Sequence, residues 1–141
     1  MYQEFQLSKP IPGKVEFVEM PDGTRIHTIV SGNGKTTILL AHGYGFSHIE
    51  WNIIVEELNQ LNYRTIVFDQ RGHGKSTIGQ DGISSSSMAS DYKGLIAYFN
   101  LEDCILVGHS MGGFLAMKFL IDNPGMQHKN IKSCVLMATF A

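Results

Sequence analysis

The ten residues CILVGHSMGG, at positions 104–113, place a serine between glycines directly after a short apolar run. The run at 104–107 is typical of a buried strand, and residues 111–122 have the apolar pattern of a helix. A G-x-S-x-G sequence on such a strand–turn–helix connection presents the serine hydroxyl above the carboxyl end of the strand. We therefore predict that Ser110 is a nucleophile. We expect the N–H of Met111, at the start of the helix, to be one of two donors to an oxyanion.

A second glycine-containing turn, HGYG at 42–45, follows a nearly all-apolar strand predicted at 36–41. Acyl transfer requires two N–H donors to the oxyanion, and a loop after a neighbouring strand has to supply the second donor. We assign it to the N–H of Tyr44, because the flanking glycines allow its backbone to approach a substrate. An ordinary glycine turn is the alternative. The residues expected around the substrate are Gly43, Gly45 and His109, of which His109 is also expected to pack or hydrogen-bond locally.

Short strands alternate with helices along the chain. A Pro-Asp-Gly turn at 21–23 separates two alternating segments and indicates a β-hairpin. This order implies a mainly parallel sheet with right-handed crossovers, helices on both faces and the hairpin as an antiparallel edge. The predicted strands are 15–19, 25–30, 36–41, 64–68, 104–107 and 131–139, and the predicted helices are 51–61, 90–99 and 111–122.

The segment DQRGHGKS begins at Asp69, directly after a predicted strand. Asp69 and Arg71 are expected to organise this loop by hydrogen bonds and charge pairing rather than to take part in catalysis. The loop histidines His42 and His73 are expected to have the same organising role.

The loop at 69–87 is long for a compact domain, and it ends in four consecutive serines. Its length indicates a functional loop, whereas the serines are equally consistent with a flexible linker. The cap of the helix that follows is expected to be Ser87 or Ser90.

Two segments, 72–76 and 32–36, end in the G-K-[ST] sequence of a phosphate-binding loop. A complete motif has a further glycine five positions before the second glycine. Asp69 and Ile29 occupy those positions, and the second segment leads into a strand rather than a helix. We therefore reject a nucleotide-binding function.

Together, these motifs resemble those of the α/β-hydrolase superfamily of lipases, esterases and lactonases. The resemblance rests on HGYG with Ser47 and Trp51, on DQRGHGKS and on GHSMGG, and it covers residues 15–141. It implies an α/β-hydrolase fold and cleavage of an ester, thioester, amide or lactone of a small molecule through an acyl-enzyme on Ser110. It implies no metal and no organic cofactor. Many dehalogenases and epoxide hydrolases of the family carry aspartate at the elbow, so Ser110 argues against these two activities.

In the family that the chain resembles, the catalytic acid and base follow the nucleophile in chain order. Only Asp122 and His128 offer a carboxylate and a histidine after Ser110. Asp122 lies about 18 Å from Ser110 along the predicted helix, and His128 lies at the opposite edge of the sheet. Neither is therefore expected to be the catalytic acid or base. We expect residues 1–141 to be the N-terminal part of a single domain, with the last strands, the cap, the acid and the base outside this sequence.

The alternative is a truncated, catalytically silent relative that acts as an interaction module. Without its base, Ser110 would be weakly activated at best. The apolar residues 134–137 would then lie at an open sheet edge that is prone to aggregation. A missing C-terminal half or an oligomeric partner is expected to cover this edge.

The composition is that of an ordinary globular protein, with 43% hydrophobic residues, 17% charged residues and a formal net charge of −2. This charge gives no basis for binding nucleic acid, and no apolar run approaches the roughly 18 residues of a membrane span. We see no secretory signal and expect a cytoplasmic location. Cys104 and Cys134 are predicted to be small core residues rather than a disulfide, and no spacing resembles a zinc site.

Overall fold

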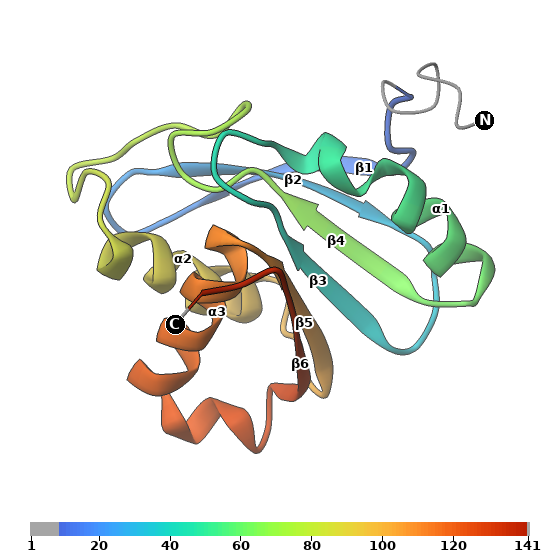
Figure 1. Ribbon diagram of the computed structural model, residues 1–141. Helices are drawn as coiled ribbons and strands as arrows, with labels where there is room; N and C mark the ends of the chain where they lie inside the picture. The colour runs from blue at the N-terminus through green and yellow to red at the C-terminus, as the bar shows by residue number, and fades with distance from the viewer. Residues whose placement is uncertain (1–8, 141) are drawn as a thin grey trace.

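The computed structural model describes residues 9–140, which form a six-stranded sheet with helices on both faces (Figure 1). The strand order is β1-β2-β4-β3-β5-β6. Strands β4, β3, β5 and β6 are parallel, whereas β2 is antiparallel to both β1 and β4. The predicted mainly parallel sheet with an antiparallel edge is confirmed. The strands are β1 (Lys14–Glu19), β2 (Arg25–Ser31), β3 (Thr37–Ala41), β4 (Arg64–Phe68), β5 (Cys104–His109) and β6 (Ile131–Met137).

Alternation of side chains along the central strands builds two cores. Leu39 in β3 belongs to the core that contains α2 and α3 residues, whereas Leu40 belongs to the core that contains α1 residues. Ile66 and Val67 in β4 divide in the same way. One face of the sheet is therefore covered by α1, and the other by α2 and α3 (Figure 1). The helices are α1 (Asn52–Gln60), α2 (Ser85–Tyr98) and α3 (Met111–Asp122), with short 3-10 helices η2 (His48–Trp51) and η3 (Pro124–Gln127).

The turn between β1 and β2 is organised by Asp22. Its carboxylate accepts hydrogen bonds from the backbone N–H and the hydroxyl of Thr24, both at 3.0 Å. Gly23 has a φ of 84°, in the left-handed region that glycine adopts without a steric penalty. The predicted hairpin is confirmed.

Helix α2 begins earlier than predicted. It starts at Ser85 rather than at position 90, and its N-cap is Ser84 instead of Ser87 or Ser90. The Ser84 hydroxyl accepts the N–H of Ser87, and the Ser87 hydroxyl accepts the N–H of Ser84. The linker interpretation is therefore wrong, because this reciprocal capping turns the serine run into the start of a helix.

Strand β6 lies at one edge of the described sheet. It ends at Met137 instead of continuing to position 139, and three apolar residues, Val135, Leu136 and Met137, are exposed on it. The open apolar edge predicted here is confirmed for the part of the chain that the structure describes. Within residues 9–140, no helix combines the length and the apolar character that crossing a membrane requires.

Both cysteines are free thiols, as predicted. Cys104 is buried in β5, and burial raises the pKa of its thiol to about 12. The thiol is therefore protonated and unreactive at neutral pH.

Candidate active site

Ser110 occupies a sharp turn between β5 and α3. Its φ of 50° and ψ of −115° form a conformation that costs an L-residue roughly 1–3 kcal/mol. The Ser110 N–H donates to the Met137 carbonyl at 2.9 Å, and the Ser110 carbonyl accepts the N–H groups of Gly113 and Phe114. The predicted strand–turn–helix context of Ser110 is confirmed, while its role as nucleophile stays a prediction.

Two glycines allow this turn to lie tightly against its neighbours. A Cβ atom on Gly112 would lie 2.3 Å from the carbonyl oxygen of Ala41, at the end of β3. A Cβ atom on Gly108 would lie 2.5 Å from the backbone nitrogen of Gly113. Side chains at these positions would push α3 away from the sheet, so the glycines set how closely Ser110 approaches the loop after β3.

The loop after β3 lies directly against the turn that carries Ser110. A Cβ atom on Gly43 would lie 3.0 Å from Nδ1 of His109 and 3.5 Å from Cβ of Ser110. The structure therefore brings together Gly43, His109 and Ser110, which the sequence assigned to one site from two distant motifs. Their contacts with a substrate stay a prediction.

The Tyr44 N–H is oriented by the carbonyl group of the preceding residue. The Gly43 carbonyl accepts the N–H of Phe46 at 3.2 Å and lies 2.7 Å from Nδ1 of His42. This carbonyl and the Tyr44 N–H belong to one planar trans peptide group, so the bonds that fix the carbonyl also fix the N–H. Neither the Tyr44 N–H nor the Met111 N–H donates to another residue in the described part of the chain. Their predicted role as donors to an oxyanion stays a prediction.

His42 is buried between two loops and both of its ring nitrogens are engaged. Its Nε2 accepts the Gln70 N–H at 3.0 Å, and its carbonyl accepts the Gln70 side-chain amide at 2.6 Å. Because Nε2 accepts, Nδ1 carries the proton and donates to the Gly43 carbonyl. Burial lowers the pKa of His42 and keeps the ring neutral. The predicted organising role of His42 is confirmed, and the ring of His73 packs beside it with the centroids 5.3 Å apart.

Asp69 is a fully buried acceptor at the centre of the same region. Its carboxylate accepts the backbone N–H of His48 at 2.7 Å, Nδ1 of His48 at 2.8 Å and the Lys75 N–H at 2.9 Å. Burial by itself raises the pKa of Asp69, but the hydrogen bonds from His48 and Lys75 outweigh it and hold the pKa at about 2. Asp69 is thus an ionised organising residue, as predicted, whereas no sequence pattern indicated His48.

One group of metal-ligand type, formed by His27, His48 and Asp69, is found among the described residues, with its donor atoms within 4.8 Å of one another. Asp69 already accepts hydrogen bonds at both carboxylate oxygens. A Cβ atom on Gly74 would lie 2.3 Å from the Asp69 carboxyl carbon, so the backbone fills the space on that side. We interpret the group as a hydrogen-bonded cluster rather than a metal site.

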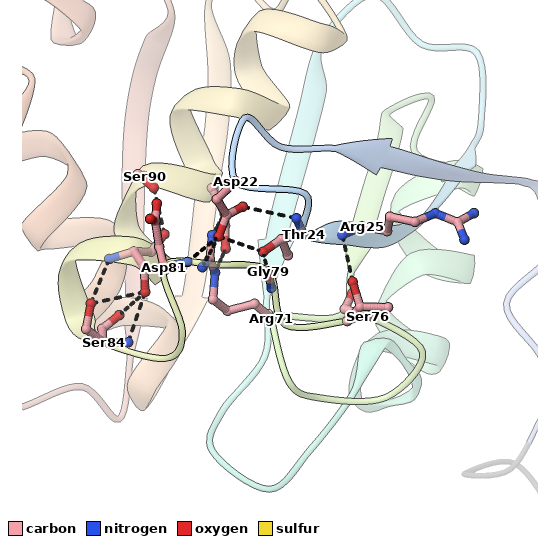
Figure 2. Close-up of polar contacts among 12 residues, drawn as sticks. Asp22, Thr24, Arg25, Arg71, Ser76, Gly79, Asp81, Ser84 and Ser90 are labelled. Atoms are coloured by element: carbon pink, nitrogen blue, oxygen red, sulfur yellow. Dashed lines mark hydrogen bonds and ion pairs between the residues drawn. The ribbon is translucent and has the colours of Figure 1, made fainter.

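Figure 2 shows Arg71 between the hairpin turn and the loop that leads to α2. The buried guanidinium donates through Nε and Nη2 to the two carboxylate oxygens of Asp91, at 2.8 and 2.7 Å. Its Nη1 donates to Asp22 and to the Gly82 carbonyl, both at 2.9 Å. Arg71 therefore ties the hairpin, the loop and α2 together, which confirms its predicted structural role.

Glu50, in η2, is a site residue that the sequence analysis missed. Its Oε2 accepts the Gly43 N–H at 3.0 Å, and its Oε1 lies 2.5 Å from Nδ1 of His109. His109 thus contacts a different loop instead of its own segment. No periodicity marks Glu50, because its position depends on one 3-10 turn. The adjoining groove, of about 530 Å³, is lined by Gly45, Phe46, Ser47, Ile49, Glu50 and Gly74.

Asp122 and His128 lie at the other end of the sheet from Ser110. Asp122 is the last residue of α3 and forms an ion pair with Lys118 at 3.0 Å. His128 follows η3, just before the start of β6, which is parallel to β5. Since Ser110 lies at the carboxyl end of β5, neither side chain is placed to act on it, as predicted.

Residues 36–141 match a family model described as alpha/beta hydrolase fold. The chain belongs to this family. This α/β-hydrolase chain is 37% identical to a non-heme haloperoxidase of Rhodococcus erythropolis over 97 residues. The matched region covers 69% of the chain and 35% of the relative. It is 30% identical to epoxide hydrolase 4 of Homo sapiens over 129 residues. This matched region covers 89% of the chain and 35% of the relative.

A solved structure extends the comparison to the fold. An esterase from Exiguobacterium antarcticum matches the α/β-hydrolase chain with a TM-score of 0.80 and 29% identity, over 87% of this chain and 44% of the esterase. The chain spans about a third of the length of the two curated relatives and under half of this structure.

Proposed function

We propose that the protein is a serine hydrolase that cleaves an ester, thioester, amide or lactone through an acyl-enzyme on Ser110. One observation carries the proposal: a serine in a strained turn lies against the loop that carries Tyr44, whose N–H donates to no other described residue. A hydroxyl with two nearby unoccupied N–H donors is the arrangement that acyl transfer requires.

In this proposal, Ser110 forms the covalent bond to the substrate, and two backbone N–H groups stabilise the charge that develops. The Ser110 oxygen forms a bond to the carbonyl carbon while its proton passes to a base, and the carbonyl oxygen becomes an anion. The N–H groups of Tyr44 and Met111 donate to that anion. When the carbonyl re-forms, the bond to the leaving group breaks, and the leaving group takes the proton. Water then attacks the acyl-enzyme and frees Ser110.

In this proposal, the catalytic base and the carboxylate that orients it come from a part of the protein outside residues 9–140. His42 is unsuited to the role because both of its ring nitrogens are engaged. His128 lies at the wrong end of the sheet. A histidine that follows in chain order is the family's usual base.

Ser110 also bears on which hydrolase chemistry applies. Two names among the relatives, haloperoxidase and epoxide hydrolase, describe other activities. Many epoxide hydrolases of the family carry aspartate at the position of Ser110. A serine at this position favours attack on a carbonyl, as the name of the esterase from Exiguobacterium antarcticum implies for that protein.

Labelling with a fluorophosphonate probe tests the proposal. The probe is added to an extract of the native source, and the mass of any labelled protein that contains the Ser110 peptide is measured. Label on Ser110, absent from a Ser110→Ala variant, supports the serine hydrolase. A chain that carries the Ser110 peptide and takes no label would contradict it and favour a catalytically silent interaction module.

A further inference from the structure

Glu50 connects the two segments that carry the candidate oxyanion donors. Its Oε2 atom accepts the Gly43 N–H at 3.0 Å, and its Oε1 atom lies 2.5 Å from Nδ1 of His109. Gly43 directly precedes Tyr44, and His109 directly precedes Ser110. A single carboxylate therefore contacts both segments immediately beside their functional residues.

The separation of these two segments decides whether two N–H groups can reach one oxygen atom. Each donor has to lie within about 3 Å of the oxyanion. The segments follow different strands, β3 and β5, so their separation depends on non-covalent contacts. A displacement of about 1 Å at a reacting group can lower a rate about 100-fold. A side chain that contacts both segments is thus placed to influence turnover.

The surroundings of Glu50 make it a well-anchored connection. Its side chain is 15% exposed, so water competes only weakly for the carboxylate oxygens. Its backbone N–H donates to the Ser47 carbonyl at 3.1 Å. The next residue, Trp51, is buried in the core that contains α1 residues. Glu50 is therefore attached to the core of the domain rather than to a free loop.

We propose that Glu50 is a positioning residue that holds the N–H groups of Tyr44 and Met111 at the spacing of an oxyanion hole. The inference rests on the function proposed above, since it concerns the same site. Glu50 acts through Gly43 and His109 in this role. The charge on its carboxylate strengthens the hydrogen bond from the Gly43 N–H, because charge-assisted hydrogen bonds are about twice as strong as neutral ones.

The experiment uses the intact protein that carries this sequence and compares the variants Glu50→Gln and Glu50→Ala. Glutamine keeps an acceptor for the Gly43 N–H but removes the charge beside His109, whereas alanine removes both contacts. Glu57, an exposed glutamate in the neighbouring helix α1, provides the matched controls Glu57→Gln and Glu57→Ala. The measurements are kcat and KM for a p-nitrophenyl ester, the rate and endpoint of fluorophosphonate labelling, and Tm.

We expect kcat per labelled site to fall about 10- to 100-fold in Glu50→Ala, with KM changed by less than about twofold. We expect a fall of about 3- to 10-fold in Glu50→Gln, because one contact remains. The labelling rate should fall in parallel, since phosphonylation also places charge on an oxygen in the site. The Glu57 variants should match the unmodified enzyme, and Glu50→Gln should keep its Tm.

The possible failures are distinguishable. Unchanged kcat per labelled site in both Glu50 variants, or a fall in Tm and labelled fraction alone, would overturn the role of Glu50 and leave Ser110 as nucleophile. Absence of label on Ser110 in the unmodified protein would overturn both proposals. Should Glu50→Ala fail to fold, the nearly isosteric Glu50→Gln decides the question.

Discussion

Ser110 has an unfavourable backbone conformation at the residue that we propose as the nucleophile. Its φ of 50° and ψ of −115° are accessible to glycine at little cost and to other residues only with strain. The hydrogen bonds to Met137, Gly113 and Phe114 hold the turn in place despite this strain. A strained conformation of this kind lowers the stability of the folded state, and such strain is common at functional sites.

The strain at Ser110 can be measured with two variants that both lack the hydroxyl. Ser110→Ala keeps the strain, whereas Ser110→Gly relieves it. We expect Ser110→Gly to have a free energy of unfolding about 1 kcal/mol higher than that of Ser110→Ala. Neither variant should take a fluorophosphonate label. Urea denaturation measures the difference, and equal stabilities would show that the turn is unstrained.

Asp69 makes stability depend on pH, because its pKa of about 2 lies below the ordinary value of 3.8. The ionised carboxylate therefore stabilises the folded state at neutral pH, and this contribution is lost as the pH falls from about 4 to about 2. We expect Asp69→Asn to lower the free energy of unfolding by about 2 kcal/mol at pH 7, and the difference from the unmodified protein to shrink below about pH 4.

Urea denaturation at a series of pH values between 7 and 3 tests this expectation. Asp122→Asn is a suitable control, because Asp122 is exposed and its pair with Lys118 should contribute less than about 1 kcal/mol. A constant difference between Asp69→Asn and the unmodified protein across this range would contradict the assignment.

Three elements of the fold meet at Arg71, which joins the β1–β2 turn to the loop before α2 and to α2 itself (Figure 2). A lysine can supply the charge but not the fork of donors that Asp91 accepts. We expect Arg71→Lys to lower the free energy of unfolding by about 3 kcal/mol, because buried carboxylates lose partners. Lys35→Arg, at an exposed position, should change it by less than about 0.5 kcal/mol. Equal melting temperatures for the two variants would contradict this.

The strands and the serine turn could be predicted because their signals are local. Apolar runs such as 64–68 match buried strands, and small residues at Gly108 and Gly112 are required by contacts with adjacent elements. The start of α2 could not be predicted, because serines favour loops until a reciprocal cap such as that of Ser84 forms. Glu50 was missed for a different reason, since its partners are brought to it only by the tertiary fold.

The open sheet edge at β6 should control the association of the whole chain. We expect residues 1–141, expressed alone, to self-associate through the exposed apolar residues of β6, because an unpaired apolar edge favours pairing with another chain. Val135→Lys should reduce this association. Val15→Lys, on β1 at the opposite edge, is the control and should leave it unchanged. Sedimentation velocity measures the outcome, and a monomer at all concentrations would contradict the expectation.

The backbone N–H and the side chain of Tyr44 have different surroundings. Its N–H is directed by the fixed carbonyl of Gly43, whereas its side chain is 77% exposed. Under the proposed chemistry, every amino acid except proline would supply the same N–H at this position. Natural variation can therefore change this exposed side chain, one mutation at a time, without removing the N–H that the proposed chemistry uses. Position 44 is thus a point at which a lineage of such enzymes can acquire new substrate preferences and keep its reaction.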